Sequence, residues 1–223
     1  IEINFPENPK KKIAVVGAGK SALQILDILY HSDKLITIFY DEDDKLTGKK
    51  LFGIEIFKFN TKQILDDFNK GLFDEIIVSF SSDLNNRKLT FQSLKKLSIP
   101  IPNLIHPHAY ISPTVKIGEG NIIFAKTIVN AFSEIGSNNF ISSFCNIEHH
   151  NYLGSHNTFG PGVMFSGSCK IHDSCKFGTG IFIEPRVVIS SDCIISSGSI
   201  IQKNLKVKTL VRTKITQEYK DLK

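Results

Sequence analysis

Residues 115–136 read VKIGEGNIIFAKTIVNAFSEIG, and this stretch decides the fold of the second half of the chain. A large apolar residue recurs at every sixth position, and the same phase continues to residue 201. Its fifteen members are Ile117, Ile123, Val129, Ile135, Ile141, Ile147, Leu153, Phe159, Phe165, Ile171, Phe177, Ile183, Ile189, Ile195 and Ile201. Neither the helical period of 3.6 nor the strand period of 2 explains this spacing. A chain that turns a corner after each short strand explains the period of six, because three hexads then form one triangular coil with the apolar residues inside.

Two further patterns share this repeat. Glycine follows the apolar position at residues 118, 136, 154, 160 and 178, which predicts glycines stacked at corners where a positive φ is needed. Small residues dominate the position two before the apolar one. They are Thr127, Ser133, Cys145, Cys169, Cys175, Cys193 and Ser199. All four cysteines share this phase, so we interpret them as reduced residues lining the core rather than as disulfides.

The first half alternates strand-like and helix-like segments, which predicts a parallel sheet covered by helices. We expect strands at residues 12–17, 35–40, 51–57, 75–80 and 100–104, and helices near residues 21–32, 61–70 and 85–97. The character of the chain changes near residue 103. The expected domains are therefore 1–102 and 103–208, followed by a tail at 209–223.

The first predicted strand ends in a turn of small residues. Gly17, Ala18, Gly19 and Lys20 stand between this strand and a helix, where backbone amides can hold a phosphate. The turn is neither a full GxGxxG nor a Walker A loop, so a tight turn without a ligand is the alternative. Asp41, just past the second strand, is a candidate acceptor for a ribose or base, or else a solvated loop carboxylate.

Composition excludes several classes of protein. The 223 residues carry 27 Lys+Arg and 22 Asp+Glu, and this net charge of +5 is too scattered for a nucleic-acid surface. No apolar run is long enough to span a membrane and the first residues do not resemble a secretory signal, so we expect a cytoplasmic protein without a membrane partner. The cysteines form no CxxC pair, which argues against a zinc ribbon.

Several motifs give the chain a resemblance to a known family. These are VGAG at residues 16–19, SDLNNR at 82–87, IHP at 105–107, IEHHN at 147–151, FGPG at 159–162 and SGS at 166–168. With the hexads, they resemble the sialic-acid O-acetyltransferase-like sugar acyltransferases, which include bacterial enzymes that acetylate UDP-4-amino-sugars. The resemblance covers about residues 11–205. It implies a Rossmann-like α/β domain followed by a left-handed parallel β-helix, acetyl-CoA as co-substrate, a nucleotide-activated sugar as acceptor, and a homotrimer.

The family motif places its catalytic histidine at His149. Stacking supports this assignment independently, because one coil of 18 residues beyond His149 lies Gly167, whose amide should sit about 4.8 Å along the prism without a side chain to shield it. A general base beside a backbone donor suits acyl transfer. The alternative is that His149 is merely an exposed polar residue.

The resemblance also assigns binding roles. Residues expected to contact the acyl carrier are Thr158, Gly167, Gly178, Gly180 and Arg212. Residues expected to contact the nucleotide sugar, besides the glycine turn and Asp41, are Ser82, Arg87 and His106. We expect no metal, because His149, His150 and His156 lack a cysteine or carboxylate at ligand spacing.

The sequence departs from the family pattern near the predicted base. His150 stands where the family has Asp or Glu, Thr158 where it has a second histidine, and residues 209–212 replace its closing Gly-x-Pro-Ala turn. His150 is still counted with the catalytic residues, because it adjoins the base and, when protonated, would lower the pKa of His149. Glu148 is an alternative partner for the ring.

These observations predict an acetyltransferase acting on the amine of a nucleotide-linked 4-amino-4,6-dideoxy sugar in surface-glycan biosynthesis. Two alternatives stay open. One is O-acylation of a sugar hydroxyl, or transfer of a longer acyl group. The other is an inactive trimeric scaffold that binds a nucleotide sugar.

Overall fold

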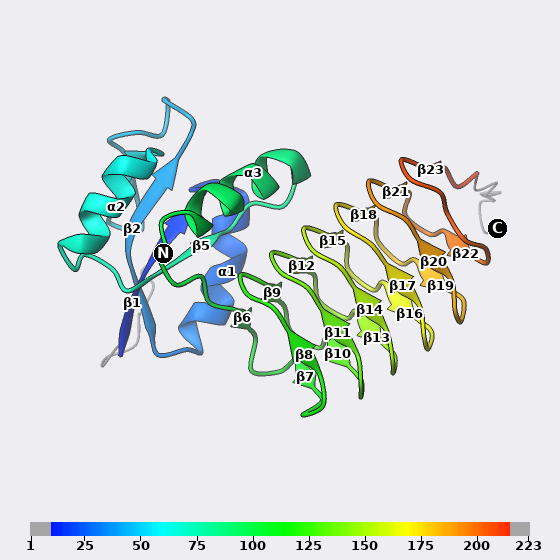
Figure 1. The fold of residues 1–223 in the computed structure, drawn as a ribbon. Coiled ribbons are helices and arrows are strands. Elements are labelled where there is room, and N and C mark those ends of the chain that lie inside the picture. The colour runs from blue at the N-terminus through cyan, green and yellow to red at the C-terminus, as the bar shows by residue number, and fades with distance from the viewer. Residues whose placement is uncertain (1–9, 215–223) are drawn as a thin grey trace, which may run out of the picture.

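The computed structural model describes residues 10–214 and shows an α/β domain followed by a β-helix (Figure 1). The α/β domain has one sheet in the order β3-β4-β2-β1-β5, in which only β3 runs antiparallel to its neighbour. Its elements are β1 (Lys11–Val16), α1 (Lys20–Tyr30), β2 (Lys34–Asp41), β3 (Lys50–Leu51), β4 (Ile54–Lys58), α2 (Thr61–Asn69), β5 (Glu75–Val78) and α3 (Leu84–Lys95). β2 pairs with one edge of β1, and β5, which comes later in the chain, pairs with the other edge. The carboxyl ends of β1 and β5 are therefore where a ligand is expected.

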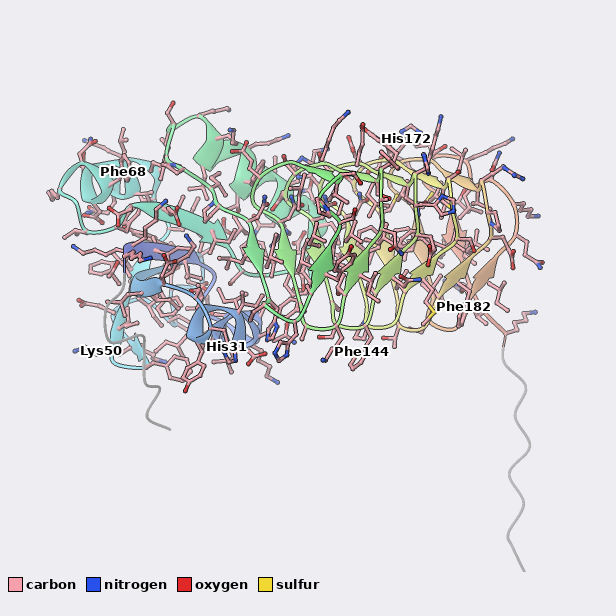
Figure 2. All side chains as sticks on the ribbon, turned by 90° about the horizontal axis from the view of Figure 1, so that it is seen from below. His31, Lys50, Phe68, Phe144, His172 and Phe182 are labelled. Carbon is pink, nitrogen blue, oxygen red and sulfur yellow. The ribbon has the colours of Figure 1, made fainter. Side chains whose placement is uncertain are left out.

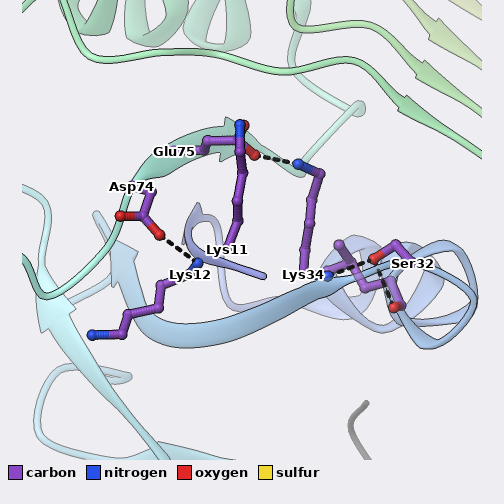
Figure 3. Close-up of polar contacts among 7 residues, drawn as sticks. Lys11, Lys12, Ser32, Lys34, Asp74 and Glu75 are labelled. Carbon is purple, nitrogen blue, oxygen red and sulfur yellow. Dashed lines mark hydrogen bonds and ion pairs between the residues drawn. The ribbon is translucent and has the colours of Figure 1, made fainter. Parts of the chain in front are cut away.

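Local chemistry explains where these elements begin. The side chain of Asn60 accepts from the backbone N–H groups of Lys62 and Gln63 at the start of α2, and Asp83 accepts from Asn86 N–H at the start of α3. At the amino ends of β1, β2 and β5, buried Glu75 pairs with Lys34 and, at 2.6 Å, with Lys11 (Figure 3). This cluster joins three strands at the end of the sheet opposite the expected ligand site.

Two predicted strands differ in the structure. The segment 51–57 is a hairpin, in which β3 and β4 are joined by a turn with Gly53 at φ +78°. Residues 100–104 do not form a strand of the α/β sheet. The Pro100 carbonyl accepts from Ile76 N–H, while Leu104 already belongs to the first strand of the β-helix.

The second half is a left-handed parallel β-helix with three sheets. We name them by the residues of one coil: sheet I holds β13 (Asn146–Ile147), sheet II holds β14 (Tyr152–Leu153) and sheet III holds β15 (Thr158–Phe159). Sheet I comprises β7 (Tyr110–Ile111), β10 (Ile128–Val129), β13, β16 (Met164–Phe165), β19 (Phe182–Ile183) and β22 (Ile200–Ile201). Sheet II comprises β8 (Lys116–Ile117), β11 (Glu134–Ile135), β14, β17 (Lys170–Ile171) and β20 (Val188–Ile189). Sheet III comprises β6 (Leu104–Ile105), β9 (Ile122–Ile123), β12 (Phe140–Ile141), β15, β18 (Lys176–Phe177), β21 (Ile194–Ile195) and β23 (Leu210–Val211).

The predicted interior is confirmed. Every residue of the apolar phase is buried except Ile117, in the first coil, which is half-buried. The small residues two positions earlier are buried as well, and all four cysteines are free thiols. Burial raises the pKa of Cys145 and of Cys175 to about 12, which keeps both protonated and unreactive.

The predicted reason for the stacked glycines is wrong. None of the five has a positive φ; the left-handed residues come two positions later, for example Gly120 and Gly162. Glycine is required because coils approach closely. A Cβ on Gly136 would lie 2.7 Å from the Gly154 carbonyl, and one on Gly160 would lie 2.6 Å from the Gly178 oxygen.

An asparagine ladder, buried from Asn121 onward, joins the coils along one corner. Asn121 Nδ2 donates to Asn103 Oδ1 and Asn139 Nδ2 donates to Asn121 Oδ1, both at 3.0 Å. Asn139 Oδ1 in turn accepts from Asn157 N–H. These asparagines recur at 18 residues in the sequence, so the same spacing that stacks the apolar phase also stacks their side chains.

The α/β domain and the β-helix share one packed boundary. The hydrophobic core of the α/β domain continues into Ile122, Phe124 and Phe140 of the first coils. At the other end, β23 pairs with β21, so the β-helix extends past the predicted limit of 208. The rest of the predicted tail, 215–223, lies outside the described residues. Within residues 10–214, no helix has the length and hydrophobicity needed to cross a bilayer.

Candidate active site

His149 lies on the corner between sheets I and II, and its imidazole covers Gly167 of the next coil. A Cβ on Gly167 would lie 2.7 Å from His149 Cε1 and 2.9 Å from Nε2. Only glycine therefore leaves room for the ring here. The expected stacking is confirmed, and it follows from the pairing of β13 with β16 in register.

The Gly167 backbone is fixed on both sides. Ser168 N–H donates to the His149 carbonyl at 3.0 Å, and the Gly167 carbonyl accepts from Arg186 N–H at 3.1 Å. Within residues 10–214, no protein acceptor takes the Gly167 N–H. Gly167 is half-buried, so its unpaired amide is a candidate donor to a ligand that binds beside the imidazole.

His150 is the partner of His149. Their Nδ1 atoms are 3.0 Å apart, so one ring donates and the other accepts. If His149 donates its Nδ1–H, its Nε2 lone pair is free beside Gly167. His150 can turn toward His149 because it occupies the left-handed corner position, with φ 56°. Phe132, one coil earlier, packs against the His150 ring at 5.2 Å.

Glu148 does not orient the imidazole. Its carboxylate accepts from Asn146 Nδ2 at 3.0 Å, and its carbonyl accepts from Ser133 Oγ at 2.9 Å and from Asn151 Nδ2. Ser133 and Asn151 are buried residues that hold this corner. The sequence predicted Ser133 only as a small core residue, and Asn151 only as the last letter of the IEHHN motif.

The residues expected to bind the carrier do not all meet at His149. Thr158 is buried under the α/β domain and donates to the Ser81 carbonyl at 3.4 Å, so a direct carrier contact there is a wrong assignment. Gly178 and Gly180 lie on the corner between sheets III and I. His149 lies at the opposite edge of sheet I, on the corner between sheets I and II. Arg212 follows β23 and is exposed.

The α/β domain carries a second candidate site at the carboxyl ends of β1 and β5. A cleft of about 230 Å³ is lined by Gly17, Gly19, Ser82 and neighbouring residues. Gly17 is indispensable for its shape, because it has φ +101° and a Cβ would lie 2.7 Å from Ser79 Oγ. Gly19 has nothing within 4 Å of its Cβ position. Neither Ala18 nor Lys20 lines the cleft.

Asp41 lines this cleft but is engaged with its own loop. One carboxylate oxygen accepts from Ala18 N–H at 2.7 Å and the other from Asp43 N–H at 2.8 Å. These hydrogen bonds hold the glycine turn. Glu42 and Asp83 are exposed carboxylates of this cleft. Glu42, which no motif in the sequence marks, accepts from Asn86 Nδ2 at 2.9 Å.

Arg87 is not a surface ligand for phosphate. It is fully buried, and its guanidinium donates to the carbonyls of Val78 and Phe80, each at 2.7 Å, and to the Asn138 carbonyl at 3.4 Å. Burial lowers the pKa of Arg87 to about 9. It ties the end of β5, and the loop that lines the cleft, to the β-helix.

His106 is also displaced from its expected role. It is buried at the junction with α1, where its Nε2 lies 3.2 Å from Asp27 Oδ2 and its Nδ1 accepts from His108 N–H. It does not line the nucleotide cleft. The sequence could not show this, because the partner Asp27 comes from the other domain.

His156 is excluded as a competing base. Burial, together with the positive charges of Lys88 and Arg87, lowers its pKa to about 4, and its Nδ1 lies 2.9 Å from Asn138 Nδ2. It is a neutral residue of the domain boundary.

Solved structures of sugar acetyltransferases share the fold of this chain. No protein-family model matches the chain. It resembles a perosamine N-acetyltransferase variant from Caulobacter crescentus, solved with CoA and GDP-perosamine, with a TM-score of 0.81, 21% identity, and coverage of 93% of this chain and 95% of that one. The acetyltransferase domain of PglB from Neisseria gonorrhoeae, in complex with acetyl coenzyme A, gives 0.74 at 24% identity over 87% and 92% of the two chains. WeeI from Acinetobacter baumannii gives 0.75 at 20% identity over 89% and 94%.

Proposed function

We propose that this protein transfers the acetyl group of acetyl-CoA to the amine of a nucleotide-linked 4-amino-4,6-dideoxy sugar. The observation that carries the proposal is the imidazole of His149 lying against Gly167, whose backbone N–H has no protein acceptor within residues 10–214. The similar structures support it, because two of them are described with CoA or acetyl coenzyme A and one with GDP-perosamine. The reaction belongs to glycan biosynthesis in the cytoplasm, where acetyl-CoA and nucleotide sugars are available.

In the proposed reaction the neutral amine attacks the thioester carbon, and the carbonyl electron pair moves to oxygen. Gly167 N–H donates to this oxyanion while His149 Nε2 takes the amine proton. The carbon–sulfur bond then breaks, and the CoA thiolate leaves with the proton from the imidazolium. No other co-reactant is needed.

His150 replaces the usual carboxylate as the group that accepts from His149 Nδ1–H. A neutral imidazole sets the same tautomer as a carboxylate would, but it does not stabilise an imidazolium by charge. The rate should rise with pH until His149 and the amine are both neutral.

The active unit in this proposal is a homotrimer. Sheet I presents an exposed apolar row of side chains that are 40–62% exposed, spaced by one coil or two. The row consists of Tyr110, Ile128, Met164, Phe182 and Ile200. Phe144, on the edge of the same sheet, is 65% exposed and projects from the same side as Phe182 (Figure 2). Contiguous apolar surface of this kind indicates a protein interface.

Three copies that pack sheet I around a common axis bring two different edges together. The corner of one copy that carries His149 then adjoins the corner of the next copy that carries Gly162 and Gly180. On this second corner a groove of about 320 Å³ lies between α1 and residues Ser142, Ser143 and Pro161. The carrier and the acceptor sugar would meet in this shared space, with the nucleotide in the Gly17 cleft of the same copy as the groove.

Thioester consumption, measured with acetyl-CoA and a panel of nucleotide amino sugars, tests the function. We expect CoA release with a nucleotide 4-amino sugar and none with its hydroxyl counterpart. His149→Ala should remove most of the activity, whereas His172→Ala should not, because it changes an exposed histidine on a different corner, between sheets II and III (Figure 2). Release only with hydroxyl acceptors would identify an O-acyltransferase, activity only with longer thioesters would revise the donor, and no release would indicate an inactive scaffold. A monomeric mass by light scattering would contradict the trimer.

A further inference from the structure

Phe132 is an exposed phenylalanine on the corner between sheets I and II, one coil before His150. Its side chain is 59% exposed and its φ is 59°, a left-handed conformation that bulky residues rarely adopt. Glycine, asparagine or aspartate would occupy such a corner at a lower conformational cost. Packing of the prism interior therefore does not explain why a phenylalanine stands here.

The stacking of the coils places Phe132 directly beside His150. His150 N–H donates to the Ala131 carbonyl at 3.0 Å, and Phe132 N–H donates to Thr114 Oγ1 at 2.9 Å, so the backbone of both corners is held from the preceding coil. The centroids of the Phe132 and His150 rings are 5.2 Å apart, and their planes differ by 31°. This is the separation of aromatic rings in contact.

His150 has few other contacts that orient its ring. Among residues 10–214, its imidazole takes part in one hydrogen bond, in which its Nδ1 lies 3.0 Å from His149 Nδ1. Phe132 and His149 are the two aromatic rings that pack against it in the described part of the chain. One coil further on stands Ser168, which is exposed and offers little surface to the other face of the ring. The orientation of His150 therefore depends on Phe132.

The orientation of His149 depends in turn on His150. The Glu148 carboxylate accepts from Asn146 and does not reach the His149 ring. Gly167 leaves room for the ring but supplies no side chain to hold it. A neutral imidazole that donates from Nδ1 keeps the lone pair on Nε2, so the hydrogen bond with His150 decides which nitrogen can act as the base.

We propose that Phe132 is a positioning residue for the acetyl transfer. Its ring holds His150 in the orientation that accepts from His149 Nδ1–H, and this leaves the His149 Nε2 lone pair beside Gly167. Phe132 acts through the two imidazoles and does not touch the substrates. The inference rests on the function proposed above, in which His149 is the general base.

Phe132→Asn tests the kinetic consequence, because asparagine removes the ring and suits the left-handed corner. We expect kcat to fall about 3–10-fold through loss of one aromatic contact, with KM for acetyl-CoA and for the nucleotide sugar unchanged. The thermal midpoint should stay the same or rise, and light scattering should give the mass of the parent. Phe132→Tyr, which keeps the ring, should retain the parent kcat.

Two controls connect this loss to His150. In a His150→Ala background, Phe132→Asn should lower kcat no further, because the ring that it holds is gone. Tyr152→Asn is the matched control and should keep the parent kcat, since Tyr152 is also exposed and its ring lies 6.4 Å from that of His172, on a different corner. A kcat of Phe132→Asn within twofold of the parent, a raised KM with unchanged kcat, or an additional loss in the double variant would overturn the proposal.

Imidazole ¹⁵N chemical shifts measure the same arrangement without acetyl transfer. At a pH where both rings are neutral, they distinguish a nitrogen that carries a proton from one with a lone pair, and His149→Ala assigns the His149 signals. The parent and Phe132→Tyr should show His149 protonated mainly at Nδ1, whereas Phe132→Asn should show both tautomers. Equal tautomer populations in the parent and in Phe132→Asn would contradict the role of Phe132. Absence of CoA release would refute the proposed function instead, and the tautomer measurement would still be readable.

Discussion

Replacement of Gly167 by alanine should separate stability from catalysis. The new Cβ would lie 2.7 Å from His149 Cε1, whereas ordinary contacts are 3.4–4 Å, so the ring must move by about 0.7 Å or more. Gly167 has no positive φ and the obstructing atoms belong to an exposed side chain, so the backbone need not move. A misplacement of about 1 Å in a reacting group can cost about 10²-fold in rate. We expect kcat to fall by that order, with the thermal midpoint unchanged.

Steady-state kinetics and thermal unfolding of the same preparation measure both effects. Gly160→Ala is the contrasting variant, since its Cβ would meet the Gly178 carbonyl at 2.6 Å and should destabilise the β-helix. A double-mutant cycle tests whether displacement of the His149 ring causes the loss. In a His149→Ala background, Gly167→Ala should lower kcat only slightly further, because the ring that it displaces is gone. A kcat for Gly167→Ala within threefold of the parent, or a full additional loss in the double variant, would refute the reasoning.

Four further outcomes are expected. Ile171→Asp buries an unpaired carboxylate in the prism, so it should lower the free energy of unfolding by about 4–5 kcal/mol or more in urea unfolding. Ile171→Val should lower it by only about 1 kcal/mol. Equal stability of the two variants would contradict the register of the hexads. Gly19→Asp adds a negative charge to the cleft without a clash, so it should raise KM for the nucleotide sugar at least about tenfold and leave KM for acetyl-CoA unchanged. Gly19→Asn, which adds no charge, should have a smaller effect. Equal effects of the two variants would show that the phosphate does not bind at this turn. His149→Ala should lower turnover by about 10²–10⁴, and His150→Ala less; the opposite order would overturn the assignment of the base. Burial lowers the pKa of His156 to about 4 in the folded chain, so the unfolded chain binds its proton first and stability should fall as pH drops from 6.5 to 4. His156→Gln should flatten this slope in unfolding measured across that range, and an unchanged slope would show that other groups cause it.

The β-helix could be predicted from the sequence in detail because its contacts repeat at a constant spacing. Each coil pairs with the next in register, so residues 18 apart, such as His149 and Gly167, must be neighbours. The same regularity places the apolar phase and the cysteines inside. The glycine positions were predicted for the wrong reason, because sequence spacing shows which residues stack but not which of them takes the left-handed conformation.

The domain junction could not be predicted in this way. Arg87, His106 and Thr158 occur in motifs that suggested ligand contacts, yet each is buried by a partner from a different segment: Asn138 for Arg87, Asp27 for His106 and Ser81 for Thr158. The partners lie 51 and 77 residues away in two of these pairs. No period in the sequence connects them.

The sequence by itself therefore determined the prism, its interior and the position of His149 beside Gly167. The tertiary structure alone decided which polar side chains face solvent and which hold the two domains together. It also brought Asp27 and His31 of α1 to the histidines of the first coil. The physical reason is that a repeat determines contacts at a constant separation along the chain, whereas the packing of one domain on another depends on the shapes of both surfaces, and these exist only after each has folded.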